Sequence, residues 1–434
     1  MRYDPADSQL FVYNRSRLSA MLKPNSMAIL DSNDLMPTNA DGTLPWRQNS
    51  DLYYLSGIDQ EESTLLLFPD AVEEIDREIL FIKETSEHIA IWEGEKLSQQ
   101  IATKLSGISN VQWNCQLDTV LERLTQQAEH IYLNANEHPR ADMTVQTRDV
   151  RLLEKCQQNY PHHHHERLAP LMHQLRIIKH PLEIKMIQKA CDITEAGFRR
   201  VLGFIGQGVG EWEIEAEFIH EFIKRQSTGF AYTPIIASGK NSCVLHYIKN
   251  NQRCQDGELL LMDVAAEYGN WNSDMTRTVP VNGKFSERQR AVYDAVLRVL
   301  RKCNDILRPG ITPKDYQNQT IDFMEGELIE LGLIDKDEAK QQDSSKPLVK
   351  KYFMHSTSHH LGLDVHDVCP PDEPYAPGMV LTIEPGIYIP DEKIGIRLEN
   401  NVLIGEKENL DLMSNIPIEA DEIETLMSQA NTGS

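Results

Sequence analysis

The chain has 434 residues, of which 25% are charged, and it carries a net charge of −23. This length exceeds what one hydrophobic core usually supports, so we expect two domains. The strong negative charge argues against nucleic-acid binding, because a phosphate backbone attracts basic surfaces. The polar start, MRYDPADSQLFVYNRS, has neither the apolar run of a signal peptide nor that of a membrane anchor. We therefore expect no membrane contacts. The seven cysteines include no CxxC pair, which favours the reducing cytoplasm.

Residues 1–173 are expected to form a smaller N-terminal domain of mixed α/β structure. Short apolar runs, which are typical of buried strands, alternate there with helical stretches. The histidine run His162 to His165 is interpreted as an exposed loop rather than a metal site. We place the domain boundary within Leu168 to Pro181, where proline, histidine and basic residues interrupt the pattern. The apolar runs are Met27 to Leu30, Leu65 to Phe68 and Glu78 to Ile82.

Residues 174–434 are expected to form a second α/β domain that begins with a helix. Apolar residues recur at helical spacing from Ile184 to Val201. Further on, Ser286 and Gln289 have the spacing of a capping box, which predicts the start of a long helix. Arg308-Pro309-Gly310 should end this helix, because proline and glycine follow helix termini.

Two aspartates lie at the edges of apolar runs in this domain. Glu258 to Ala265 carries Asp263 near its end, and Trp271 to Val281 carries Asp274. The two acids are 11 residues apart, which allows two adjacent antiparallel strands to bring both carboxylates to one point.

Two later apolar runs repeat this arrangement. Val380 to Ile389 carries Glu384, and Ile394 to Ile404 carries Glu399, so we expect a second hairpin that faces the first. A lone acid is usually a solvated surface group, but an unpaired charge inside an apolar run is costly. Together with His359, the four acids predict a site for two divalent metal ions, because anionic oxygens are needed to hold two cations close together. This oxygen-rich set favours Mn²⁺, with Co²⁺ or Zn²⁺ as substitutes.

Several segments of the chain resemble the signature segments of the pita-bread metallopeptidases, and most of all those of aminopeptidase P, the Xaa-Pro aminopeptidases. The segments are HSTSHHLGLDVHD, LTIEPGIYI, IGIRLEN and MDVAAEYGNWNSDMTRTVPVNGKF. Leu44 to Gly57 (LPWRQNSDLYYLSG) resembles the N-terminal domain of the same family. The resemblance implies a pita-bread catalytic domain at 174–434, preceded by an aminopeptidase P-type domain at 1–173. It also implies peptide substrates with proline at the second position, cleaved just before that proline.

Carried onto this chain, the resemblance implies a role for each metal ligand. Asp263 and Asp274 would hold one metal, and Asp274 and Glu399 would bridge to the second, whose shell His359 and Glu384 complete. Glu384 would also move the proton of an attacking water that the two metals activate.

The resemblance implies further roles outside the metal shell. His355 and His366 match histidines that stabilise the tetrahedral oxyanion or the substrate carbonyl. Arg397 matches an arginine that orients a ligand carboxylate. His246 matches a histidine that contacts the proline side of the substrate.

An Xaa-Pro bond has no N–H at the scissile nitrogen, so the enzyme must recognise the proline ring by its shape. Tyr388 and the histidines are expected to line an apolar slot for that ring. Trp92, in the segment IWEG, resembles a tryptophan that reaches the active site of a neighbouring subunit. The resemblance thus implies a homodimer or homotetramer.

Two departures from the family pattern bear on the substrate. His360 stands where relatives usually have another aromatic residue, and its role is left open. Residues Asp367 to Met379 contain no basic side chain, although relatives often have an arginine there that holds the substrate carboxylate. The near alternative is a prolidase that acts on Xaa-Pro dipeptides, and the missing basic residue argues against it. A third alternative is a pita-bread binding protein without activity, which the five intact ligands disfavour.

Overall fold

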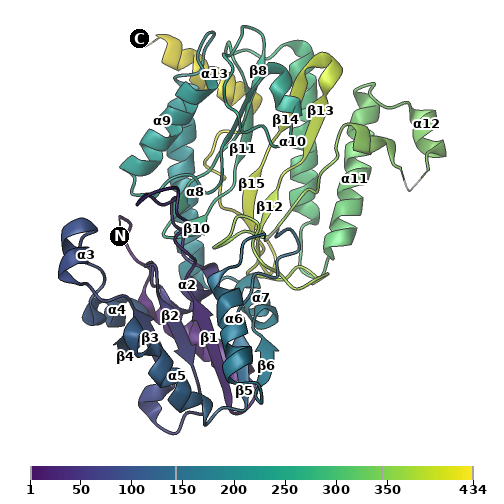
Figure 1. The fold of residues 1–434 in the computed structure, drawn as a ribbon. Helices are drawn as coiled ribbons and strands as arrows, with labels where there is room; N and C mark the ends of the chain where they lie inside the picture. The colour runs from purple at the N-terminus through teal and green to yellow at the C-terminus, as the bar shows by residue number, and fades with distance from the viewer. Residues whose placement is uncertain (1, 142–143, 344–345, 433–434) are drawn as a thin grey trace. The chain divides into compact units, whose positions relative to one another are not determined.

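The fold in Figure 1 is that of a computed structural model, which describes residues 2–141, 144–343 and 346–432. The chain divides into two compact units, Tyr3–Arg176 and Ile177–Ser434. Each unit combines helices with β-strands. Among the described residues, no helix has both the length and the apolarity needed to cross a membrane.

A six-stranded sheet in the order β4-β3-β2-β1-β5-β6 forms the centre of the N-terminal unit. The three apolar runs predicted to be strands are β1, β2 and β3. The strands β1 and β2 are buried along their whole length, because helices and loops cover the sheet. The strands are β1 (Ser26–Asp31), β2 (Thr64–Leu67), β3 (Glu78–Ile82), β4 (Asn110–Trp113), β5 (His130–Leu133) and β6 (His164–Arg167). The helices are α1 (Ser8–Met21), α2 (Ser50–Ser56), α3 (Glu87–Trp92), α4 (Gln99–Ser106), α5 (Leu117–Thr125), α6 (Arg148–Asn159) and α7 (Ala169–Ile177).

The histidine run at 162–165 differs from its expected form, which was an exposed loop. Its second half belongs to β6, which pairs in parallel with β5 and places His164 opposite His130. At the edge of a sheet, polar side chains do not prevent backbone pairing, and edge strands are commonly polar. The run is therefore partly strand.

Helices flank the strands of the C-terminal unit, with the pair α8–α9 and the pair α10–α11 packed beside them (Figure 1). The predicted first helix lies within α8, which begins after the N-cap His180. The predicted capping box is confirmed at α10, where the Ser286 hydroxyl accepts a hydrogen bond from the Gln289 N–H. These helices are α8 (Pro181–Leu202), α9 (Glu211–Lys224), α10 (Glu287–Ile306), α11 (Pro313–Glu330), α12 (Lys336–Gln341) and α13 (Ala420–Thr432).

Short antiparallel strands make up the rest of this unit. The predicted pairing of the two aspartate segments is confirmed, because β8 pairs with β11 and places Asp263 opposite Thr276. The two glutamate segments each break into two strands, so that β12 pairs with β15 while β13 pairs with β14. The strands are β7 (Ile235–Ser238), β8 (Leu259–Asp263), β9 (Glu267–Tyr268), β10 (Trp271–Asn272), β11 (Thr276–Pro280), β12 (Val380–Ile383), β13 (Gly386–Ile389), β14 (Ile394–Arg397), β15 (Asn400–Leu403) and β16 (Leu410–Asp411).

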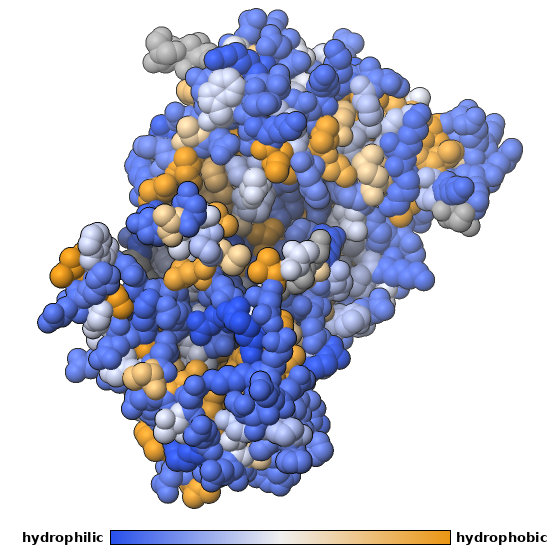
Figure 2. All heavy atoms as spheres, viewed as in Figure 1, coloured by the Kyte–Doolittle hydropathy of each residue, from blue (hydrophilic) through white to orange (hydrophobic). Residues whose placement is uncertain are grey.

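Hydrophilic residues dominate the face of the protein shown in Figure 2, and apolar residues form small scattered groups there. Isolated apolar side chains are normal on protein surfaces and need no special explanation. This surface agrees with the acidic composition of the chain.

Candidate metal centre

Each of the four predicted acidic ligands lies at the end of a strand or in a break between two strands, whereas His359 lies in a loop. Asp263 is the last residue of β8, and Asp274 lies just before β11. Glu384 follows β12, and Glu399 precedes β15. These positions place the four acids at the ends of neighbouring strands, within reach of one another.

The structure brings these predicted ligands into one cluster. Ligand atoms of Asp274, His359 and Glu399 all lie within 4.8 Å of one another. His359 Nε2 is 3.3 Å from Asp274 Oδ2 and 3.5 Å from Glu384 Oε1. Asp263 lies close enough to Asp274 for the two charges to interact. The five residues therefore form a single concentration of acidic groups around one imidazole.

Hydrogen bonds fix the orientation of the imidazole of His359. Its Nδ1 lies 3.0 Å from the backbone carbonyl of His360, so Nδ1 donates and Nε2 is left facing the acids. The backbone N–H of His359 donates to the hydroxyl of Thr382 over 3.1 Å. This arrangement is typical of a metal-binding histidine, whose second nitrogen is usually held by a carbonyl or a carboxylate.

Neighbouring side chains also hold the carboxylates. Tyr232 donates its O–H to Asp263 Oδ1 over 2.5 Å, and Arg397 donates to Asp263 Oδ2 over 2.6 Å. The hydroxyl of Thr276 donates to Glu399 Oε2 over 2.7 Å. Arg397 thus has the carboxylate-orienting contact that the resemblance implied. These roles of Tyr232 and Thr276 could not be predicted from the sequence, because a single tyrosine or threonine in an apolar segment carries no distinguishing pattern.

The buried charges of this cluster are poorly neutralised by the protein itself. Glu399 is 2% exposed, and its Oε1 has no hydrogen-bond partner among the described residues. Burial raises the pKa of Glu399 well above its ordinary range, and the charges of Asp274 and Glu384 raise it further. Burial also raises the pKa of Glu384 to about 7. Burial lowers the pKa of His359, but the hydrogen bond to Asp274 and the charge of Glu384 outweigh this effect and raise it to about 9.

The donor set of the cluster fits divalent metal ions. Four carboxylates and one imidazole suit hard or borderline cations that prefer oxygen ligands. The unpartnered Oε1 of Glu399 is the kind of buried acceptor that a cation would satisfy. The side chains of Asp263, His359 and Glu384 are 13–18% exposed, so the cluster is open to solvent.

A hydrogen-bonded relay lies beside the cluster. His355 Nδ1 is 2.8 Å from the carbonyl of Ser356, and its Nε2 is 2.9 Å from the hydroxyl of Tyr388. Because a carbonyl can only accept, Nδ1 carries the hydrogen and Nε2 accepts from Tyr388. Arg397 Nη1 donates to the same hydroxyl over 2.9 Å. Burial and the charge of Arg397 lower the pKa of His355 to about 4, so this imidazole is neutral.

Tyr388 has a different setting from the one expected. We predicted that it would help to line an apolar slot for the proline ring, but in this structure it is only 1% exposed. Its hydroxyl joins His355 to Arg397, as described above, and its ring packs edge-on against the imidazole of His355. Tyr388 therefore supports its neighbours in this structure.

Three further predicted residues, His366, His246 and Trp92, lie outside the five-residue cluster. His366 is exposed, and its ring centroid is 3.9 Å from that of His359. His246 is exposed in the loop after the 3₁₀ turn Gly239–Cys243, near enough to His355 for their charges to interact. Trp92 ends α3 of the N-terminal unit with 75% of its surface exposed. Its contact with a neighbouring subunit stays a prediction.

His360 contributes to the site through its backbone. Its carbonyl accepts from His359 Nδ1 and from the backbone N–H of Asp367, which closes the loop between the two residues. The ring is buried, and its Nδ1 has no hydrogen-bond partner in the part of the chain that the structure describes. Burial and the nearby charge of Lys179 lower the pKa of His360 to about 3, so the ring is neutral.

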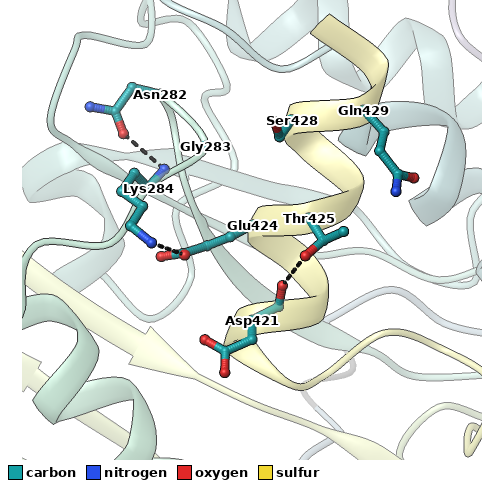
Figure 3. Close-up of a pocket in the computed structure, with 8 residues that line it drawn as sticks. All are labelled: Asn282, Gly283, Lys284, Asp421, Glu424, Thr425, Ser428 and Gln429. Carbon is teal, nitrogen blue, oxygen red and sulfur yellow. Dashed lines mark hydrogen bonds and ion pairs between the residues drawn. The ribbon is translucent and has the colours of Figure 1, made fainter. Parts of the chain in front are cut away.

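A separate surface pocket of about 700 Å³ lies between the turn Asn282–Lys284 and α13 (Figure 3). An ion pair between Lys284 and Glu424 lines it, together with other polar side chains of α13. The proposed metal ligands are not among the residues that line it, so this hollow is distinct from the candidate metal centre.

Comparisons with known proteins assign the chain to a family. The model of metallopeptidase family M24 matches residues 185–406, and that of the aminopeptidase P N-terminal domain matches residues 11–132. The Xaa-Pro aminopeptidase of Escherichia coli (strain K12) is 33% identical over 97% of this chain and 98% of its own length. The chain therefore belongs to metallopeptidase family M24.

Solved structures give the same result over almost the full length. A protein from Bacillus anthracis described as an aminopeptidase P superposes with a TM-score of 0.90 at 31% identity, covering 99% of this chain and 100% of that one. Aminopeptidase P from E. coli, solved with the inhibitor Pro-Leu, gives 0.87 at 32% identity with the same coverage. These matches confirm the predicted pita-bread fold with an aminopeptidase P-type N-terminal domain. They also confirm the prediction of a metalloexopeptidase, and the family implies divalent metal ions.

Proposed function

We propose that the protein is an Xaa-Pro aminopeptidase, which removes the N-terminal residue from peptides whose second residue is proline. The observation that carries this proposal is the convergence of Asp274, His359 and Glu399 in one cluster beside Glu384 and Asp263. The E. coli relative described above is named for the same reaction. A non-catalytic binding protein would not need four buried or half-buried carboxylates that repel one another without cations.

Two Mn²⁺ ions are the proposed cofactors, with Co²⁺ or Zn²⁺ as competent substitutes. Asp263 and Asp274 would hold one ion, and His359 and Glu384 would hold the other. Asp274 and Glu399 would be shared between them. When bound, the ions would supply an activated water and would polarise the scissile carbonyl.

Glu384 is the proposed general base and acid. It lies in the break between β12 and β13, and the hydroxyl of Thr382 donates to its Oε1 over 3.3 Å. Its carboxylate would take a proton from the attacking water and deliver it to the leaving nitrogen of proline. This delivery matters for an Xaa-Pro bond, because the nitrogen would otherwise leave as an unstable anion.

His355 and His366 are the proposed stabilisers of the substrate oxygen. His355 carries its hydrogen on Nδ1, which lies 3.8 Å from Glu384 Oε2. This N–H could turn from Ser356 to the developing oxyanion, and Tyr388 would hold the other side of the ring. His366, whose ring centroid lies 3.9 Å from that of His359, would present a second donor. His246 is the proposed contact for the proline side of the substrate.

The segment Asp367 to Met379 supports longer substrates over dipeptides. It contains no basic side chain that could hold a free carboxylate near the cluster. The E. coli aminopeptidase P was solved with Pro-Leu as an inhibitor. A dipeptide that begins with proline is what remains when one residue is removed from Xaa-Pro-Leu. The comparisons do not favour the prolidase alternative.

Two further proposals concern assembly and location. The exposed Trp92 is proposed to contact another copy of the chain, in a homodimer or homotetramer. The seven cysteines are all free thiols, which supports a reducing compartment such as the cytoplasm.

The requirement for proline is tested with two tripeptides that differ only at the second residue. The Mn²⁺-loaded protein is incubated with Leu-Pro-Ala and with Leu-Ala-Ala, and released leucine is measured by mass spectrometry. We expect release from Leu-Pro-Ala alone. Equal release from both peptides would refute the proline specificity, and an inactive Glu384→Gln variant serves as the control for contaminating peptidases.

A further inference from the structure

The proposed metal ligands come from two separate sheets that meet along a line of buried polar side chains. β11 belongs to the sheet β11-β8-β7, whereas β15 belongs to the sheet β12-β15-β16. The backbone N–H of Glu399 donates to the carbonyl of Thr276 over 3.0 Å, which links the two sheets. The separation of Asp274 and Glu399 depends on how these sheets are joined.

Asn401 makes the first of the joining contacts. Its side chain is 0% exposed, its Oδ1 accepts from the backbone N–H of Asp274 over 2.9 Å, and its Nδ2 donates to the carbonyl of Asp274 over 2.7 Å. A primary amide can do both at once, because it has an acceptor and a donor side by side. Asn401 thus pairs with Asp274 as a neighbouring strand would, although the two residues are 127 positions apart.

Arg277 makes the second set of contacts from the other sheet. Its guanidinium is 0% exposed, and Nη1 donates to the carbonyls of Thr276 over 2.9 Å and of Glu399 over 2.7 Å. Nη2 donates to the side chain of Asn400 over 2.7 Å, and Nε donates to the carbonyl of Pro417 over 2.9 Å. These hydrogen-bond acceptors are uncharged, so the arginine fixes the position of the backbone rather than neutralising a carboxylate.

We propose that Asn401 and Arg277 are positioning residues that together set the distance between the carboxylates of Asp274 and Glu399. The proposal rests on the assignment of these two acids as metal ligands. The two acids repel each other. Hydrogen bonds between the two sheets are therefore needed to hold the acids close together. Metal binding tolerates errors of only about 0.5 Å in ligand placement, and the loss of such outer contacts typically weakens it by roughly 10–100-fold.

Asn250 supplies a matched control in the same unit. It is 5% exposed, its Oδ1 accepts from the N–H of Ile236 over 3.0 Å, and its Nδ2 donates to the carbonyl of Pro234 over 3.0 Å. Its Nδ2 also donates to Glu215 Oε2 over 2.9 Å. Asn250→Ala therefore loses buried amide hydrogen bonds as Asn401→Ala does, together with one bond to a carboxylate, and none of these bonds involves Asp274 or Glu399. Asn250 also has a φ of 43°, where alanine is strained, so the control should lose at least as much stability.

The test measures Mn²⁺ binding by equilibrium dialysis, with free Mn²⁺ read by electron paramagnetic resonance, and thermal unfolding in EDTA. We expect Asn401→Ala to raise the Kd for Mn²⁺ roughly 10–100-fold. Asn250→Ala should bind Mn²⁺ like the unmodified protein, although its unfolding temperature falls. Unchanged Mn²⁺ binding by Asn401→Ala, or equal weakening in both variants, would overturn the proposal.

Two further variants, Asn401→Asp and Arg277→Lys, test the proposal if Asn401→Ala does not fold. Asn401→Asp keeps the shape and the acceptor for the Asp274 N–H, but it places an oxygen against the Asp274 carbonyl. It also adds a negative charge beside the cations, so weaker Mn²⁺ binding would support positioning, and equal or tighter binding would contradict it. Arg277→Lys keeps the positive charge but loses the several N–H donors of the guanidinium. Normal Mn²⁺ binding by this variant would remove Arg277 from the proposal.

Asp274→Asn separates this inference from the function on which it rests. If Asp274→Asn binds Mn²⁺ normally, the ligand assignment itself fails. If Asp274→Asn loses Mn²⁺ while Asn401→Ala retains it, only the positioning role fails.

Discussion

Replacing Glu399 by glutamine should change the stability of the protein in opposite directions with and without metal. Without metal, Glu399 is a buried acid with one unpartnered oxygen, and Asp274 and Glu384 repel its charge. A buried polar group without a partner costs about 1–3 kcal/mol. Near neutral pH this acid must either stay charged among other acids or take up a proton, and both cost free energy. Glu399→Gln avoids both at almost constant shape, so the variant should be more stable than the unmodified protein in EDTA by a similar amount.

The order should reverse in Mn²⁺. A ligand present at about 100 times its Kd stabilises the folded state by about 2.7 kcal/mol. In a unit the size of Ile177–Ser434, each kcal/mol corresponds to a shift of about 2–4 °C in the unfolding temperature. The unmodified protein should therefore gain roughly 5–10 °C with Mn²⁺, whereas Glu399→Gln should gain little.

Thermal unfolding followed by circular dichroism, in EDTA and in MnCl₂, measures both effects. Glu221→Gln is the control, because Glu221 is 5% exposed but is held by Arg225 and by Arg200 at 3.5 Å. This control should lose stability in both solutions and keep its gain with Mn²⁺. The reasoning is refuted if Glu399→Gln is less stable than the unmodified protein in EDTA, or if it gains as much from Mn²⁺.

Three further predictions concern single side chains. His355→Ala should lower kcat by roughly 10²-fold or more at unchanged Mn²⁺ content, and unchanged kinetics would exclude it from the mechanism. Tyr388→Phe removes the O–H that holds His355. It should lower kcat by roughly tenfold, less than His355→Ala does. An equal or larger loss of kcat would mean that Tyr388 does more than hold His355. Burial and the charges of Asp31 and Asp51 raise the pKa of Asp149 to about 7. The folded state then binds the proton of Asp149 more tightly than the unfolded state, so stability should fall as the pH rises from about 4 to about 7. Asp149→Asn should flatten this dependence in urea unfolding, and a parallel pH profile would contradict the assignment.

Much of the candidate metal centre could be predicted from the sequence, because its four acids lie inside or at the edges of apolar runs where an unpaired charge is costly. Asp263 at the end of β8 and its pairing with the strand after Asp274 followed from run length and spacing alone. The capping box at Ser286 followed in the same way, since its signal is local. These features depend on residues that are close together in the chain.

Other features depend on contacts between distant segments, which no local pattern contains. The breaks that place Glu384 and Glu399 between strands appeared in the sequence as continuous apolar runs. Tyr388 is buried because its ring packs with Ile235 and Leu261 from a distant part of the chain, while its hydroxyl bonds to His355 and Arg397. The pairing of Asn401 with Asp274 depends on the meeting of two sheets, and a single asparagine in an apolar run gives no sign of it.

The central claim is tested most directly by comparing a peptide of three residues with its two-residue counterpart. The Mn²⁺-loaded protein is incubated with an Xaa-Pro-Xaa tripeptide and with the matching Xaa-Pro dipeptide, and release of the N-terminal residue from each is measured. We predict rapid release from the tripeptide and little from the dipeptide. Preference for the dipeptide would make the protein a prolidase, and no cleavage of either peptide at full metal occupancy would contradict the assignment of the cluster as a catalytic centre.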